Sequence, residues 1–89
     1  MHDTFLNQNL YESIVRLCKI HSIFKILDIT ITVHLHSHIS EESIRDHFTE
    51  RNSTLIGNWT NILVQKKETE PLTATVEQID GEKIIQATL

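Results

Sequence analysis

The feature that most constrains the fold is a stretch at residues 27–36 in which apolar and polar side chains alternate. A period of two is typical of a β-strand with one apolar and one polar face. Such a strand belongs to a sheet that is covered on one side only, and we expect helices to cover that side. The apolar positions are Ile29, Ile31, Val33 and Leu35.

The segment before this strand, residues 4–21, is predicted to form a helix because its apolar residues recur every three or four positions. Asp3 or Thr4 can cap its start. Cys18 lies beside the core-facing stripe, and we interpret it as a small buried apolar residue rather than a reactive thiol. The stripe consists of Leu6, Leu10, Ile14 and Leu17, widened by Phe5, Val15 and Cys18.

A second helix is expected to begin after Ser40, which is a favourable N-cap. Two glutamates follow in the first turn, where the helix dipole favours negative charge. Ile39 and Ile44 stand at the spacing of a hydrophobic staple, in which an apolar residue before the cap packs against one in the helix.

The rest of the chain is predicted to form strands. Residues 59–66 form one strand. The apolar run in its centre is continuous, so the sequence does not indicate which face of the strand is buried. After a charged break, Asp80-Gly81 is typical of a type I′ turn in a hairpin. The register of that turn places three apolar pairs on one face. The pairs are Val76 with Ile85, Ala74 with Ala87, and Leu72 with Leu89.

This order of elements predicts a two-layer α+β fold, with two helices packed on one face of a three- to four-stranded, mostly antiparallel sheet. The 89 residues make one small domain, residues 1–89. A chain of this length buries only about 60% of its extended surface, so its stability is modest and a homodimer would be one way to bury more.

Composition argues against several classes of protein. A net charge of −4 argues against a general nucleic-acid binder, which would carry a basic patch. Neither a signal peptide nor a membrane span is recognised, so we expect a soluble cytoplasmic protein. A single cysteine provides no intrachain disulfide and no cysteine zinc site. With no nucleophile paired to a base and no phosphate-binding loop, we expect no enzyme.

The start of the chain, Met1-His2-Asp3, carries the donor atoms of a metal site. The terminal amine, the His2 amide nitrogen and the His2 imidazole can hold one ion in a plane and leave one position for another ligand. Planar nitrogen ligation favours Ni(II) or Cu(II) over Zn(II). Asp3 could complete the ligand set, although we favour a capping role for it. The alternative interpretation is a terminus that binds no metal.

A second set of candidate ligands is His34, His36 and His38. On a strand, His34 and His36 share one face about 7 Å apart, which suits a shared ion. The alternative is the solvated polar face of a one-sided sheet. His21 and His47 lie on or near helices, and we interpret them as surface or partly buried residues rather than ligands.

This order of elements, opened by a Met-His-acid start, resembles the nickel-binding half of HypA-type proteins, the factors that insert nickel into hydrogenases and sometimes ureases. That family begins Met-His-Glu and continues into an amphipathic helix. Its alternating strand, turn and short helix match residues 29–48, and its small-residue loop and edge strand match residues 53–66. Its final strand follows a Gly-Glu pair, as residues 81–89 do. The resemblance covers most of the chain.

The chain departs from the family pattern in three places. The family carries a zinc domain with two Cys-x-x-Cys pairs before its last strand, whereas residues 68–80 contain no cysteine, so no zinc is expected. Asp3 stands where the family has glutamate, and its carboxylate reaches one carbon less far. Histidines replace glycine, glutamate and serine in the turn after the first strand.

Two functional hypotheses follow. In the first, the resemblance implies a metallochaperone-like protein that binds Ni(II) at Met1 and His2 and passes it to a nickel-enzyme precursor, such as a hydrogenase, or to an accessory GTPase. In the second, the chain is a HypA-like interaction or assembly module that no longer binds nickel. A homodimer through an exposed sheet edge would fit the second hypothesis.

Overall fold

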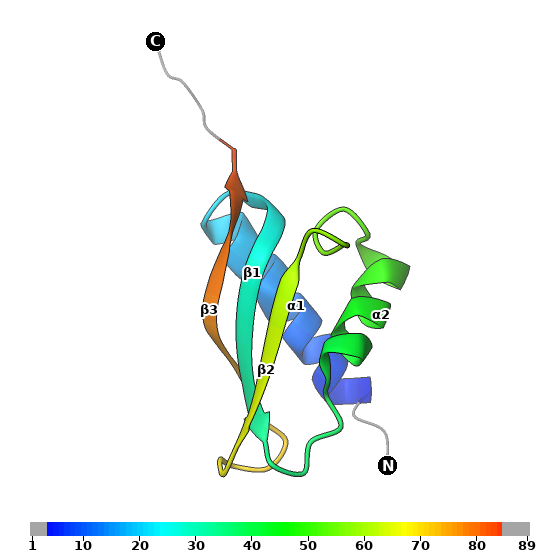
Figure 1. Ribbon diagram of the computed structural model, residues 1–89, viewed down its shortest axis with the longest axis vertical. Helices are drawn as coiled ribbons and strands as arrows, with labels where there is room; N and C mark the ends of the chain where they lie inside the picture. The colour runs from blue at the N-terminus through cyan, green and yellow to red at the C-terminus, as the bar shows by residue number, and fades with distance from the viewer. Residues whose placement is uncertain (1–3, 85–89) are drawn as a thin grey trace.

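The computed structural model describes residues 4–84, which form two helices and a three-stranded sheet (Figure 1). The strand order is β2-β1-β3, with β1 parallel to β2 and antiparallel to β3. Both helices pack on the apolar face of this sheet, which confirms the predicted α+β class. The elements are α1 (Thr4–Ile20), β1 (Ile23–His34), α2 (Glu41–Arg51), β2 (Asn61–Lys67) and β3 (Ala74–Lys83).

The central strand β1 is the alternating stretch from which the sequence analysis began. Ile29, Ile31 and Val33 are at most 1% exposed and form the centre of the core. The strand starts at Ile23, four residues earlier than predicted. It also ends earlier, because the Ser37 N–H donates to the His34 carbonyl and turns the chain. Leu35 therefore lies in a turn and is 46% exposed, so its prediction as a strand core residue was wrong.

Helix α2 begins as the sequence predicted. The Ser40 hydroxyl accepts a hydrogen bond from the Ser43 N–H, and the Ser43 hydroxyl accepts one from the Ser40 N–H. This reciprocal pair satisfies two backbone donors at the helix start. Ile39 and Ile44, the two residues at staple spacing, are both buried. Together they fix the angle at which the chain enters the helix.

The loop between α2 and β2 is held by Arg45. Its guanidinium donates to the carbonyl oxygens of Gly57 and Thr60. The Thr60 hydroxyl in turn donates to the Ile26 carbonyl at 2.7 Å, which ties the loop to β1. These bonds set the start of β2, where Ile62 faces the core and Leu63 is 50% exposed. The structure thus shows which face of β2 is buried, a question that the sequence did not decide.

The predicted hairpin at Asp80-Gly81 is wrong. Both residues lie inside β3, where Asp80 pairs with Asp28 and Gly81 with Ile26. Neither glycine among residues 4–84 has a positive φ, whereas a type I′ turn requires one. Pairing along the whole of β1 therefore outweighs the local turn preference. The hairpin partners of the three predicted apolar pairs fall at residues 85–89, outside the described residues.

Gly81 is instead required by the close approach of β3 to β1. A Cβ atom at this position would overlap the carbonyl oxygen of Lys25 and stand 2.9 Å from a methyl carbon of Ile23. Gly81→Ala is therefore expected to lower the free energy of unfolding by about 1–3 kcal/mol, as overpacking does. Denaturant titration measures this, with Glu82→Ala, an exposed neighbour, as the control. Gly81→Asn distinguishes the two interpretations, because a turn would tolerate asparagine and the strand would not.

Candidate functional site

The three histidines after the centre of β1 gather at one end of the molecule. They line a pocket of about 240 Å³, which we call the histidine pocket. Its lining residues come from the end of β1 and the turn after it, from the first turn of α1 and from the connection between β2 and β3. Figure 1 shows the end of β1 and the start of α1 at the same end of the molecule. The remaining lining is mostly apolar. The lining residues are Leu6, His34, His36, Ser37, His38, Pro71 and Leu72.

His34 and His36 lie side by side, as the sequence predicted, although His36 is in the turn rather than on the strand. Their ring centroids are 5.4 Å apart. The His36 N–H donates to Nδ1 of His34 at 3.1 Å. A ring nitrogen that accepts a hydrogen bond carries no proton, so neutral His34 holds its proton on Nε2. In this arrangement neither nitrogen of His34 is ready to bind a metal ion.

The imidazole of His36 differs from that of His34 in its hydrogen bonding. Its side chain is exposed, and no hydrogen bond joins either ring nitrogen to residues 4–84. His38 is also exposed and lines the same pocket. Within residues 4–84, no three His, Cys, Asp or Glu side chains are placed to hold a metal ion together. The three histidines thus share a pocket without forming a three-ligand site by themselves.

The other predicted metal ligands, Met1, His2 and Asp3, lie outside the described residues. What the structure does place is the first turn of α1, which begins at Thr4. Leu6 in that turn forms a wall of the histidine pocket. The helix that follows the first candidate site in the sequence therefore contributes a wall to the pocket that the second candidate site lines.

The connection between β2 and β3 closes one side of the histidine pocket. Because β2 and β3 flank β1 on opposite sides, residues 68–73 cross the end of β1 (Figure 1). Leu72 in this connection has φ 61° and is 74% exposed. A left-handed conformation costs a residue with a side chain about 1–2 kcal/mol. Sequence reasoning missed Leu72 and Pro71 as pocket residues because the predicted hairpin placed Leu72 in another strand pair.

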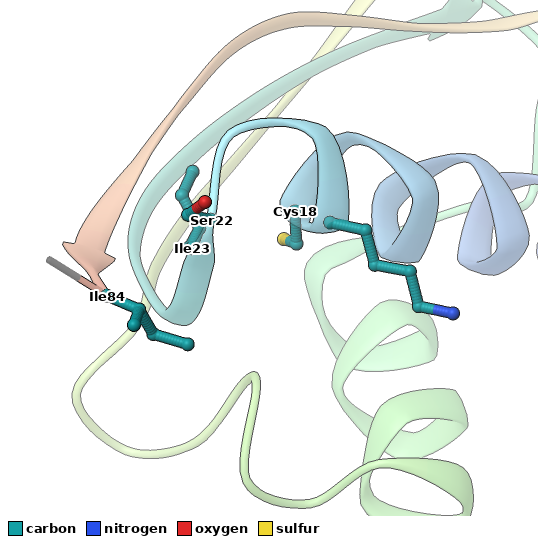
Figure 2. A pocket seen from close by; sticks show the side chains of 5 residues that line it. Cys18, Ser22, Ile23 and Ile84 are labelled. Atoms are coloured by element: carbon teal, nitrogen blue, oxygen red, sulfur yellow. The ribbon is translucent and has the colours of Figure 1, made fainter. Parts of the chain in front are cut away.

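A larger cavity, of about 530 Å³, lies at the opposite end of α1. Figure 2 shows the Cys18 sulfur on the side of Ser22 and Ile23, with Ile84 at the far side of the opening. Cys18 is 3% exposed, and burial raises the pKa of its thiol to about 11. The thiol therefore stays protonated near neutral pH, when it is a poor nucleophile and metal ligand. This confirms the interpretation of Cys18 as a buried apolar residue.

His47 joins the two helices. Its Nε2 donates to Oε1 of Gln8 at 2.9 Å, and its ring lies 5.5 Å from that of Tyr11. Burial and the nearby Arg51 lower the pKa of His47 below its ordinary value of 6.5. His47 thus supports the packing of α1 on α2. His21, by contrast, is exposed at the end of α1. Neither lines the histidine pocket.

The lowered pKa of His47 predicts a pH dependence of stability. The unfolded chain binds a proton at this residue near pH 6.5, whereas the folded chain binds it only at lower pH. The stability that neutral His47 contributes is thus fully present above pH 6.5. It is lost as the pH falls through the folded-state pKa of His47. We expect the unfolding free energy of the parent to fall more steeply between about pH 7 and pH 5 than that of His47→Gln. Parallel slopes for the two proteins would contradict this assignment.

None of the family models, curated proteins or solved structures compared with this chain matches it. The resemblance to HypA-type proteins therefore stays a prediction from the sequence. The structure also changes one detail of it, since the last strand begins at Ala74, well before Gly81. None of the helices in residues 4–84 is long and apolar enough to cross a membrane.

Proposed function

We propose that this protein is a metallochaperone-like carrier that binds Ni(II) at the end of the fold where α1 begins. The observation that carries the proposal is the shared pocket. Leu6, in the first turn of α1, and the three histidines after β1 line one cavity. The helix that follows the Met-His start in the sequence thus meets three imidazoles in one pocket, whereas His21 and His47 do not line it.

The donor set fits nickel as cargo. The terminal amine, the His2 amide and the His2 imidazole are nitrogen donors, and planar nitrogen ligation suits Ni(II). The amide nitrogen must lose its proton to bind, so loading releases protons and unloading is favoured as pH falls. The receiver we propose is a nickel-enzyme precursor or an accessory GTPase.

The cellular setting follows from the proposal. Cys18 is a free, buried thiol, which fits a reducing compartment such as the cytoplasm. The exchange requires only ligand substitution, so we propose no enzymatic reaction. No cysteine zinc site is needed, because the fold of residues 4–84 is built around an apolar core.

The test is a Ni(II) titration by calorimetry with parallel absorbance, on protein whose chain begins at a free Met1 amine. The control is the same protein with two residues added before Met1, which removes the terminal amine from the motif. We expect near one-to-one binding and the absorbance of planar nickel for the free terminus, and loss of both for the extended protein. Equal binding by the two proteins would contradict the proposal.

A second candidate function is that of an assembly module. Two observations favour it: β2 and β3 are both edge strands, and apolar side chains are exposed at Leu63 and Leu72. An unpaired edge strand is a template for strand addition by another chain. Light scattering across a concentration series tests this candidate. A monomer at all concentrations would count against self-assembly, and a dimer that persists without metal would favour it.

A further inference from the structure

We propose that the outer edge of β3 binds an extended segment of a partner protein in which basic and apolar side chains alternate. This inference rests on the assembly function, the second candidate above, and does not depend on nickel binding. β3 lies at one side of the sheet, and β1 is its only strand partner among residues 4–84 (Figure 1). The backbone groups along its outer edge are therefore a template for strand addition.

The free edge of β3 is long enough for a strand of ordinary length. β3 runs from Ala74 to Lys83, and strands of about five to six residues are the most common. The Gly81 N–H donates to the Asp80 carboxylate at 2.9 Å, so we place the added strand beside residues 74–79. β2 is shorter and ends in two lysines, which discourage strand addition at an edge.

The side of β3 that faces the helices offers apolar contacts to an added strand. Val76 and Ile79 pair with Ile31 and Ile29 of β1, which are buried, but are themselves only partly buried. Ile29 and Ile31 stand two residues apart and cover one side of this apolar pair. A strand about 4.8 Å away on the other side would cover the rest with residues at the same spacing. The partner segment therefore carries apolar residues at alternate positions.

The opposite face of β3 carries negative charge. Asp80 stands directly opposite Asp28 of β1, and like charges at such a position destabilise a sheet. Glu82 pairs with Lys25, whose ammonium group lies over the Trp59 ring at 4.7 Å. None of the basic side chains in residues 4–84 forms an ion pair with any of these three carboxylates. A basic side chain from a partner would supply the missing positive charge.

This charge favours a basic partner over a second copy of the chain. A second β3 would bring the same carboxylates together, and a net charge of −4 adds to the repulsion between two copies. Lysine or arginine at alternate positions of an added strand would instead lie beside Glu77 and Asp80. The Glu77 carboxylate accepts a hydrogen bond from the Thr32 hydroxyl of β1 at 2.9 Å. Its side chain thus turns toward β1 and away from the free edge.

The experiment measures the binding of three short fluorescent peptides to the full chain by anisotropy, at about 0.1 M salt to limit long-range charge effects. The first peptide alternates lysine and valine, and the second alternates glutamate and valine. The third has the composition of the first, with all lysines placed before the valines. We expect the first peptide to bind at least about tenfold more tightly than either of the others, because only it matches both the charge and the alternation of β3.

A double variant tests the charged face. Glu77→Gln/Asp80→Asn keeps the oxygen atoms that accept from Thr32 and Gly81 but removes both charges. It should bind the first peptide about 2- to 30-fold more weakly, since cross-strand ion pairs are lost. The matched control Glu42→Gln/Asp46→Asn makes the same change in net charge at exposed positions of α2 and should bind like the parent. Both variants should unfold at the denaturant concentration of the parent.

Nitrogen–proton NMR spectra locate the bound peptide, and we expect shifts along residues 74–79. Shifts confined to β2, absence of binding by the first peptide, or equal binding of all three peptides would overturn the inference. Equal weakening in the two double variants would overturn it as well, as would a dimer of the free protein that pairs through β3. A free protein that is monomeric counts against self-assembly alone and leaves this inference intact. The nickel titrations bear only on the metallochaperone proposal.

Discussion

Phe48→Ala is expected to lower the free energy of unfolding by about 3–5 kcal/mol, because it removes a fully buried aromatic ring from a core that contains few other aromatic rings. Phe48 is 1% exposed and belongs to the cluster between α2 and the sheet. It also makes an edge contact with the Tyr11 ring, at a centroid distance of 4.8 Å, across the two helices. A domain of 89 residues has a total stability of about 4–13 kcal/mol, so this loss is a large fraction of it.

Thermal unfolding followed by circular dichroism measures the effect. In a domain of this size each kcal/mol lowers the melting temperature by about 4–8 °C, so we expect a decrease of at least about 12 °C. The matched control is Phe5→Ala, since Phe5 is 81% exposed. That change should shift stability by no more than about 0.5 kcal/mol. Equal effects of the two substitutions would contradict the packing of α2 on the sheet.

His2→Ala is expected to reduce the affinity for Ni(II) by at least about 100-fold, which makes it the largest functional effect of a single substitution. The change removes one nitrogen donor and also the chelate ring that helps the His2 amide to lose its proton. The terminal amine and the backbone amide of residue 2 then remain from the motif. The absorbance of planar nickel should disappear with the affinity. Calorimetry and absorbance on the same samples measure both quantities.

The control for His2→Ala is the combined change of His34, His36 and His38 to glutamine. It leaves the three N-terminal donors intact, so we expect weakened binding rather than its loss. A protein that binds normally after His2→Ala but fails after the triple change would place the metal on the histidine pocket alone. That result would contradict the terminal site and the resemblance on which it rests.

The sequence correctly predicted the elements that are determined by residues close together in the chain. The alternation in residues 27–36 identified the central strand, and Ser40 identified the start of α2 through its side-chain hydrogen bonds. Helix α1 followed from apolar spacing and ends within a residue of its predicted end. Each of these signals acts over a few residues, where side-chain periodicity and capping decide the structure.

The sequence-based predictions were wrong where the structure depends on pairing between strands that are far apart in the sequence. Asp80-Gly81 has the local chemistry of a turn, but extending the ladder between β1 and β3 satisfies more backbone groups than a hairpin would. The same error hid the connection that brings Leu72 to the histidine pocket. The meeting of Leu6 with His34 and His36 depends on how α1 crosses the sheet, and no local pattern encodes it. His34, His36 and His38 were therefore visible in the sequence as candidate ligands, but the pocket that they line together with Leu6 was not.

The most direct measurement is the nitrogen–proton NMR spectrum of the protein before and after addition of one equivalent of Ni(II). Planar Ni(II) is diamagnetic, so nearby backbone signals should shift rather than vanish. We expect the largest shifts at Leu6, at residues 34–38 and at Leu72, with none at His21 or His47. Shifts centred on His21 or His47, or a spectrum unchanged at the histidine pocket, would contradict nickel binding at this end of the fold.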